Sequence, residues 1–164
     1  MDLGIIGFQR SGKTTVFNAV TRGHAETGSY GAGVQPNIGV VKVPDQRLDD
    51  LSKLFHPKKT THADIRYIDF PGSAFGEGHG PSPQFLAQLA RCDALIHVVR
   101  AFRDDTVPHP QGSVDPARDA AAMELELAFA DAAFIEKRLE RIEIQVRSMK
   151  AGERDAAERE VDLL

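Results

Sequence analysis

The sequence predicts an α/β fold followed by a long helical segment, and three observations lead to that prediction. Short apolar runs alternate with stretches in which apolar residues recur at helical spacing. The first and third of these runs lead into glycine-rich loops, as strands of an α/β sheet often do. Beyond Pro116, the chain carries a helical pattern with a single clear break.

Four strands and three short helices are expected before that segment. The strands are expected at residues 3–8, 38–43, 63–70 and 93–102. The helices are expected at residues 13–22, 45–55 and 84–92. Two glycine-rich stretches, at residues 23–37 and 71–83, show no periodicity, and loops of such length are often functional.

The composition is that of an ordinary globular protein, with 41% hydrophobic and 27% charged residues. A formal net charge of −4 argues against broad, non-specific binding of nucleic acid. The single cysteine, Cys92, cannot form an intramolecular disulfide, and no apolar run approaches the roughly 18 residues of a membrane helix. The sequence therefore predicts a cytoplasmic protein that does not enter a membrane.

A heptad seam in the last part of the chain predicts an antiparallel helical hairpin, with plain core packing of the seam against the sheet as the alternative. Apolar residues in a 4-3-4-3 spacing form the seam, at Ala128, Ala132, Ile135, Leu139, Ile142, Val146 and Met149. Asp115 is expected to cap the N-terminus of the first helix, just before Pro116. The sequence KAGERD breaks the seam, and the same spacing resumes after it. We expect two parts, a domain at residues 1–116 and the helical segment at 117–164.

Residues 7–14 read GFQRSGKT and match the phosphate-binding pattern G-x-x-x-x-G-K-[ST]. In such a loop, backbone N–H groups surround the phosphates of a nucleotide at the N-terminus of a helix. Lys13 would reach the β- and γ-phosphates, and the hydroxyl of Thr14 would bind Mg²⁺. The remaining residues expected to contact the nucleotide are Gln9, Arg10, Ser11, Gly12 and Thr15.

A second element, Asp69-Phe70-Pro71-Gly72, follows another expected strand. An aspartate at that point can hold a water bound to Mg²⁺, and the N–H of Gly72 can contact a γ-phosphate. P-loop kinases of small metabolites have little use for an Asp-x-x-Gly element there. The two elements together favour a GTPase-type nucleotide switch, with a kinase as a distant alternative. Asp69 joins Thr14 as an expected magnesium ligand.

Several longer stretches are more specific than the phosphate loop. They are GKTTVFNAVT, QPNIGVVKVPDQRLDDL, DFPG followed by GEGHG and QFL, and DALIHVVRAF, with VDPARD and MELELAFAD after them. In these stretches the chain resembles the YchF-type branch of the Obg-related, translation-factor-class GTPases, along almost its whole length. The resemblance implies a Ras-like P-loop NTPase core with an inserted coiled coil. It also implies bound GTP or ATP with Mg²⁺ and an association with the ribosome.

The chain departs from that family in its phosphate loop and in its first switch segment. Gln9 and Arg10 stand where the resemblance leads us to expect proline and asparagine. Arg10 either replaces a potassium ion beside the phosphates or simply faces solvent. Gly33 stands where this class offers a threonine to Mg²⁺, so that Thr27 or Ser29 would have to supply the hydroxyl.

Ser73 follows Gly72, at a position where many GTPases have a glutamine that orients water. Another group must then position the water. The resemblance implies that a loop histidine, His109, has this role, so that Lys13 and His109 are the two expected catalytic residues. A neutral imidazole can accept a proton at pH 7. A solvated loop histidine without a role is the alternative, and His79 is a weaker candidate.

The sequence contains no Asn-Lys-x-Asp or Asn-x-x-Glu element, which would select the base, so GTP and ATP are both expected. About four strands make an incomplete sheet, and we expect a fragment of a longer protein, with a short, degenerate paralogue as the alternative. The leading hypothesis is a Mg²⁺-dependent NTP-binding protein with slow hydrolysis. A second hypothesis, supported by Gly33 and Ser73, is a nucleotide sensor that does not hydrolyse. A third is a module whose helical hairpin docks a ribosomal or protein partner.

Overall fold

The computed structural model describes residues 1–25, 35–72, 75, 81–146, 154, 157, 159–161 and 163. The chain divides into two compact units, Met1–Met123 and Glu124–Leu164. Some of the residues considered above lie outside the described residues, namely Thr27, Ser29, Gly33, Ser73, His79 and Met149.

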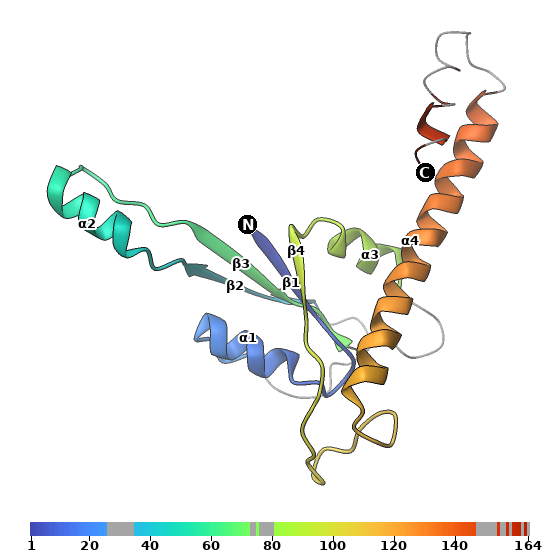
Figure 1. The fold of residues 1–164 in the computed structure, drawn as a ribbon, viewed down its shortest axis with the longest axis horizontal. Helices are drawn as coiled ribbons and strands as arrows, with labels where there is room; N and C mark the ends of the chain where they lie inside the picture. Colours follow the sequence, from blue (N-terminus) through green and yellow to red (C-terminus); the bar gives the residue numbers. More distant parts are fainter. Residues whose placement is uncertain are drawn as a thin grey trace. The chain divides into compact units, whose positions relative to one another are not determined.

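A four-stranded mixed sheet organises the first unit (Figure 1). Its strands are β1 (Asp2–Ile6), β2 (Asn37–Lys42), β3 (Asp64–Asp69) and β4 (Ala94–His97), in the order β2-β3-β1-β4. β1 is parallel to β3 and β4, whereas β2 is antiparallel to β3. The carboxyl ends of β1, β3 and β4 therefore meet at one edge of the sheet, where ligands bind in open α/β folds. All four strands expected from the sequence are present, which confirms the α/β fold class.

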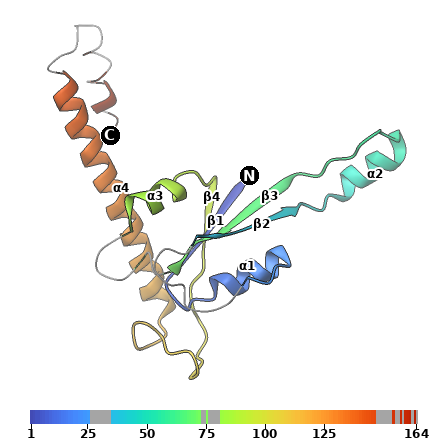
Figure 2. The same ribbon diagram turned by 180° about the vertical axis from the view of Figure 1, so that it is seen from behind.

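Helices lie on both sides of this sheet (Figures 1 and 2). On one side, α1 (Lys13–Thr21) packs against β1, β2 and β3 and buries Phe17. On the other side, α3 (Pro83–Leu89) places the ring of Phe85 edge-to-face with Phe70 and Phe75, at centroid distances of 5.3 and 5.2 Å. α2 (Gln46–Phe55) lies between β2 and β3 in the chain, so the three short helices expected from the sequence are all present.

The strand β4 is shorter than the sequence predicts. The apolar run predicts a strand over 93–102, but the strand ends at His97. Beyond the strand, the guanidinium of Arg100 binds the backbone of the residues that follow it. Its Nε donates to the carbonyl oxygen of Phe102 (3.2 Å), and its Nη2 donates to that of Asp104 (3.3 Å). These hydrogen bonds hold the segment in a compact loop, which a continuing strand could not form.

The long helix α4 (Pro116–Val146) begins in the first unit and continues into the second. Asp115 caps its N-terminus, because its Oδ1 accepts a hydrogen bond from the backbone N–H of Arg118 (3.0 Å). The cap predicted from the sequence is therefore confirmed. Among the described residues, no helix combines the length and the apolar character needed to cross a membrane.

The predicted heptad seam is buried only in part within the second unit. Ile142 is buried, Ile135, Leu139 and Val146 are half-buried, and Ala128 and Ala132 are exposed. Arg138 forms an ion pair with Glu160 at 2.6 Å, and Ala157 is also buried. The antiparallel hairpin, and the division of the chain at residues 1–116 and 117–164, stay predictions.

Candidate phosphate-binding site

The loop of residues 7–14 lies at the carboxyl end of β1 and leads directly into α1 (Figure 1). Three of its residues have a positive φ, namely Gly7 (150°), Arg10 (61°) and Gly12 (99°). Gly12 is the N-cap residue of α1 and has no side chain to bind the first N–H groups of the helix. The N-terminus of α1 therefore meets the loop without a side-chain cap, which is an arrangement that favours an anion.

Lys13 is the first residue of α1, and it is only 5% exposed. Its Nζ donates a hydrogen bond to the carbonyl oxygen of Phe8 within the same loop (2.9 Å). Burial lowers the pKa of Lys13 from 10.5 to about 8, and the nearby negative charge of Asp69 opposes that change. The ammonium group is thus held in the loop at an energetic cost, which a bound anion would offset.

Thr14 and Asp69 meet at this edge of the sheet, as the sequence predicts for two ligands of one ion. The hydroxyl of Thr14 donates to Oδ2 of Asp69 (2.8 Å), and Asn37 donates to the same oxygen from β2 (3.3 Å). Asp69 is completely buried at the end of β3. Within the described part of the chain, no group of three or more His, Cys, Asp or Glu side chains could hold a metal ion by themselves. One hydroxyl and one carboxylate fit Mg²⁺, which keeps its other positions for phosphate and water.

Gly72 lies directly against the loop, three residues after Asp69. A Cβ at this position would lie 2.5 Å from Nζ of Lys13 and 2.9 Å from the backbone nitrogen of Gln9. Such distances are too short for any side chain, so this close approach requires glycine. The structure thus brings the Asp-x-x-Gly element onto the same loop as Lys13.

The other loop residues named above differ in their surroundings. Ser11 is buried, whereas Gln9 and Thr15 are exposed. Arg10 is also exposed, and its Nη1 donates to the carbonyl oxygen of Pro108 (3.0 Å). In this arrangement the guanidinium of Arg10 binds the loop that carries His109, the residue next to Pro108.

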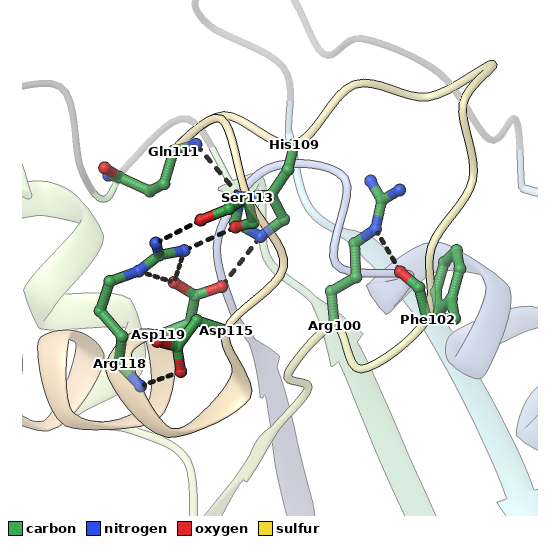
Figure 3. A network of polar contacts seen from close by, with 8 residues as sticks. All are labelled: Arg100, Phe102, His109, Gln111, Ser113, Asp115, Arg118 and Asp119. Atoms are coloured by element: carbon green, nitrogen blue, oxygen red, sulfur yellow. Dashed lines mark hydrogen bonds and ion pairs between the residues drawn. The ribbon is translucent and has the colours of Figure 1, made fainter.

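His109 is held inside its loop rather than solvated, with a side chain that is 6% exposed. Its Nε2 lies 2.9 Å from Oδ2 of Asp119, and its Nδ1 accepts the backbone N–H of Gln111 (3.1 Å). Figure 3 shows the carboxylate of Asp119 between the imidazole of His109 and the guanidinium of Arg118. Sequence reasoning did not find Asp119 or Arg118.

A small cavity of about 10 Å³, enough for one water molecule, lies beside the phosphate loop. Its lining includes Gln9 and Ser11 of that loop together with Arg100, His109 and Asp119. Within the described residues, Oγ of Ser11 and Nη1 of Arg100 are buried and make no hydrogen bond. The loop of His109 and the end of β4 therefore lie beside Gln9 and Ser11 around this cavity.

This fold and this loop define a class of protein, the P-loop nucleotide-binding proteins. A model of the family described as 50S ribosome-binding GTPase matches residues 2–130, and the chain belongs to that family.

Individual relatives show which branch of this family the chain resembles. The chain is 42% identical over 142 residues to the ribosome-binding ATPase YchF of Bacillus subtilis, which covers 85% of this chain and 39% of that protein. It is 36% identical over 156 residues to the ribosome-binding ATPase YchF of Escherichia coli O157:H7, with 93% and 42% covered. The solved structure of the Schizosaccharomyces pombe YchF GTPase matches with a TM-score of 0.69 at 33% identity, covering 99% of this chain and 44% of that one. The resemblance to YchF-type GTPases is confirmed, and the chain spans about two fifths of the length of the curated relatives it matches.

Proposed function

We propose that this chain carries the phosphate-binding part of a YchF-type protein that binds GTP or ATP with Mg²⁺ and hydrolyses it slowly. The products would be the nucleoside diphosphate and phosphate. One observation carries the proposal: Asp69 and Gly72, which follow β3, lie against Thr14 and Lys13 of the phosphate loop at the carboxyl edge of the sheet. The names of the relatives, ribosome-binding ATPase in one case and GTPase in another, support ATP and GTP as candidate ligands.

Each part of the site has a physical task in this proposal. The loop amides and the ammonium of Lys13 would bind and orient the β- and γ-phosphates, and the N–H of Gly72 would contact the γ-phosphate. Thr14 and Asp69 would hold Mg²⁺, which supplies positive charge to the phosphates when bound. Asp69 is suited to binding Mg²⁺, because its carboxylate is buried near the ammonium group of Lys13 in the same site.

His109 would accept a proton from the attacking water, since no glutamine follows Gly72 in the sequence. A specific observation favours the alternative of a nucleotide sensor that does not hydrolyse. Both ring nitrogens of His109 are engaged, one by Asp119 and the other by Gln111, so neither is open to water in this conformation. Hydrolysis therefore requires at least one of these two contacts to open.

We further propose that the protein is cytoplasmic and that it associates with the ribosome. The names of the relatives, ribosome-binding ATPase, support the association with the ribosome. Residues 117–164 would form an antiparallel helical hairpin that offers a surface to such a partner. The ion pair between Arg138 and Glu160 and the burial of Ile142 and Ala157 support the hairpin. Cosedimentation of the chain with purified ribosomes tests the association, and recovery of all the protein in the supernatant would contradict it.

The nucleotide proposal is tested by titrating the chain with fluorescent ATP and GTP analogues, in Mg²⁺ and in EDTA. We expect binding that Mg²⁺ strengthens, and Asp69→Asn should remove most of that strengthening. Asp64→Asn is a matched control, because Asp64 lies exposed at the start of the same strand. Absence of nucleotide binding would overturn the proposal, whereas binding without single-turnover hydrolysis would favour the sensor.

A glycine-to-alanine change at position 72 gives a sharper test of the site's geometry. The new methyl group would collide with the backbone of Gln9, and moving that backbone would distort the phosphate loop. It would also displace the ammonium group of Lys13. We expect Gly72→Ala to weaken nucleotide binding by about 10-fold, as overpacking of this size implies. Gly112→Ala is the control for backbone strain without a collision, because Gly112 has a positive φ (76°) but a Cβ there meets nothing within 4 Å. Unchanged nucleotide affinity in Gly72→Ala would show that the phosphates do not lie at this edge.

A further inference from the structure

The hydrogen-bond partners of His109 fix which ring nitrogen carries its proton. Nδ1 accepts a hydrogen bond from the backbone N–H of Gln111 (3.1 Å), so Nδ1 carries no hydrogen. Nε2 lies 2.9 Å from Oδ2 of Asp119, an acceptor, so Nε2 carries the hydrogen and donates it. The imidazole is therefore neutral in this arrangement, with Nδ1 as its basic nitrogen.

Asp119 is itself fixed, so it can impose this state on His109. Its side chain is 5% exposed, and its Oδ1 accepts hydrogen bonds from Nε (2.9 Å) and Nη2 (2.8 Å) of Arg118. Arg118 is in turn held by Ser113, whose carbonyl oxygen accepts from Nη2 (2.8 Å) and whose Oγ accepts from Nη1 (3.1 Å) (Figure 3). The two carboxylate oxygens thus have separate tasks, one toward Arg118 and one toward His109.

The His109–Asp119 pair lies next to the phosphate loop. Both residues line the small cavity beside Gln9, and the neighbouring Pro108 binds Arg10 of that loop through its carbonyl oxygen. The other charged or titratable groups around this cavity are Arg100 and His97, at the end of β4. No second carboxylate among the residues that line the cavity competes with Asp119 for the imidazole.

From this geometry we infer that Asp119 is a positioning residue for hydrolysis: it holds His109 as the Nε2–H tautomer and so presents Nδ1 as the base. The inference rests on the proposed function, because it assigns His109 the role of proton acceptor. Only the contact between Nδ1 and the N–H of Gln111 has to open for a water molecule to reach Nδ1. The hydrogen bond to Asp119 is kept throughout.

In the proposed step, His109 takes one proton from the attacking water. The oxygen of water forms a bond to the γ-phosphorus while the bond from that phosphorus to the β,γ-bridging oxygen breaks. One proton of the water passes to Nδ1 of His109, and the electron pair of the broken bond leaves with the nucleoside diphosphate. His109 then carries hydrogens on both nitrogens, next to the carboxylate of Asp119, and releases the proton from Nδ1 to solvent. No oxidant, reductant or further reactant is needed.

The first test needs no substitution at Asp119. Nitrogen-15 NMR of histidine-labelled protein distinguishes the two neutral tautomers, and His109→Gln identifies the signal of His109. We expect the Nε2–H tautomer in the wild-type chain. The Nδ1–H tautomer would overturn the inference, whatever the chain does with nucleotides.

The second test replaces Asp119 with asparagine, which keeps the shape of the side chain. The asparagine oxygen can still accept from Arg118, but its NH₂ group then faces Nε2 and favours the opposite tautomer. We expect the single-turnover rate constant at saturating ATP or GTP to fall by about 10- to 100-fold, with nucleotide affinity within twofold of wild type. The NMR signature should move to the Nδ1–H tautomer.

Asp115→Asn is the matched control, because it makes the same chemical change four residues earlier. Asp115 caps α4 and has no contact with His109 among the interactions described, and asparagine caps helices equally well. The control should keep both the rate and the tautomer. If the wild-type chain binds nucleotide but does not hydrolyse it, that result would contradict both the proposed hydrolysis and the inference about Asp119. Hydrolysis that Asp119→Asn leaves unchanged, or accelerates, would overturn the inference alone.

Discussion

Replacing Gly7 with alanine should lower the free energy of unfolding by about 3 kcal/mol or more. Gly7 joins β1 to the phosphate loop with φ at 150°, a conformation that L-residues rarely adopt. A Cβ at Gly7 would also lie 2.3 Å from the carbonyl oxygen of Val98, at the end of the neighbouring strand. Neither backbone can withdraw without breaking the parallel pairing of β1 with β4, so the strain and the collision add.

Urea unfolding followed by circular dichroism measures this effect, since the chain contains no tryptophan. Gly12→Ala separates the two causes, because Gly12 also has a positive φ (99°) but a Cβ there meets nothing within 4 Å. That control should lose only about 1–2 kcal/mol. Equal losses in Gly7→Ala and Gly12→Ala would show that the contact with Val98 does not matter.

The phosphate loop could be predicted because its geometry is encoded locally. Glycines at fixed spacing permit the turn, and Lys13 and Thr14 follow at the start of a helix whose apolar spacing is visible in the sequence. Asp69 and Gly72 could be predicted for a similar reason, since each lies within three residues of the end of a strand. Parallel strands then bring both elements to one edge of the sheet.

The surroundings of His109 could not be predicted from the sequence. They depend on the path of the loop between β4 and α4, which folds the histidine back onto the first turn of a helix. One signal was available: Asp119 follows the N-cap Asp115 by four residues and so lies on the same face of α4.

The contacts of two arginines, Arg100 and Arg10, could not be predicted from the sequence either. Arg100 stands in an apolar run that predicts a strand over 93–102, but the strand ends three residues earlier, at His97, and the guanidinium of Arg100 binds the carbonyl oxygen of Phe102 in the loop that follows. Arg10 has φ at 61°, a conformation in which asparagine is far more common than arginine. Its hydrogen bond to Pro108 joins residues 98 positions apart, a contact that local patterns do not contain.

Replacing Lys13 with methionine should have opposite effects on binding and on stability. Without the ammonium group, the affinity for ATP and GTP should fall by about 100-fold or more, because a bound phosphate loses a buried charged partner. The nucleotide-free protein should become more stable at pH 7, by about 1–2 kcal/mol. Burial holds the pKa of Lys13 at about 8 instead of 10.5, so the charged form destabilises the fold by roughly 3 kcal/mol. Part of that gain is lost because the carbonyl oxygen of Phe8 loses its donor.

The pH dependence of this difference follows from the sign of the shift. Between pH 8 and 10.5 the unfolded chain binds the proton that the folded chain has released, so the wild-type protein gains stability as the pH rises. The stability advantage of Lys13→Met should therefore shrink across that window. Urea unfolding at several pH values and titration with fluorescent nucleotides measure the two effects. Lys53→Met is the control, since Lys53 is exposed on α2 and should change neither quantity appreciably. A Lys13→Met variant that is less stable at pH 7, or that binds nucleotide as tightly as wild type, would contradict a lysine held at an energetic cost for phosphate binding.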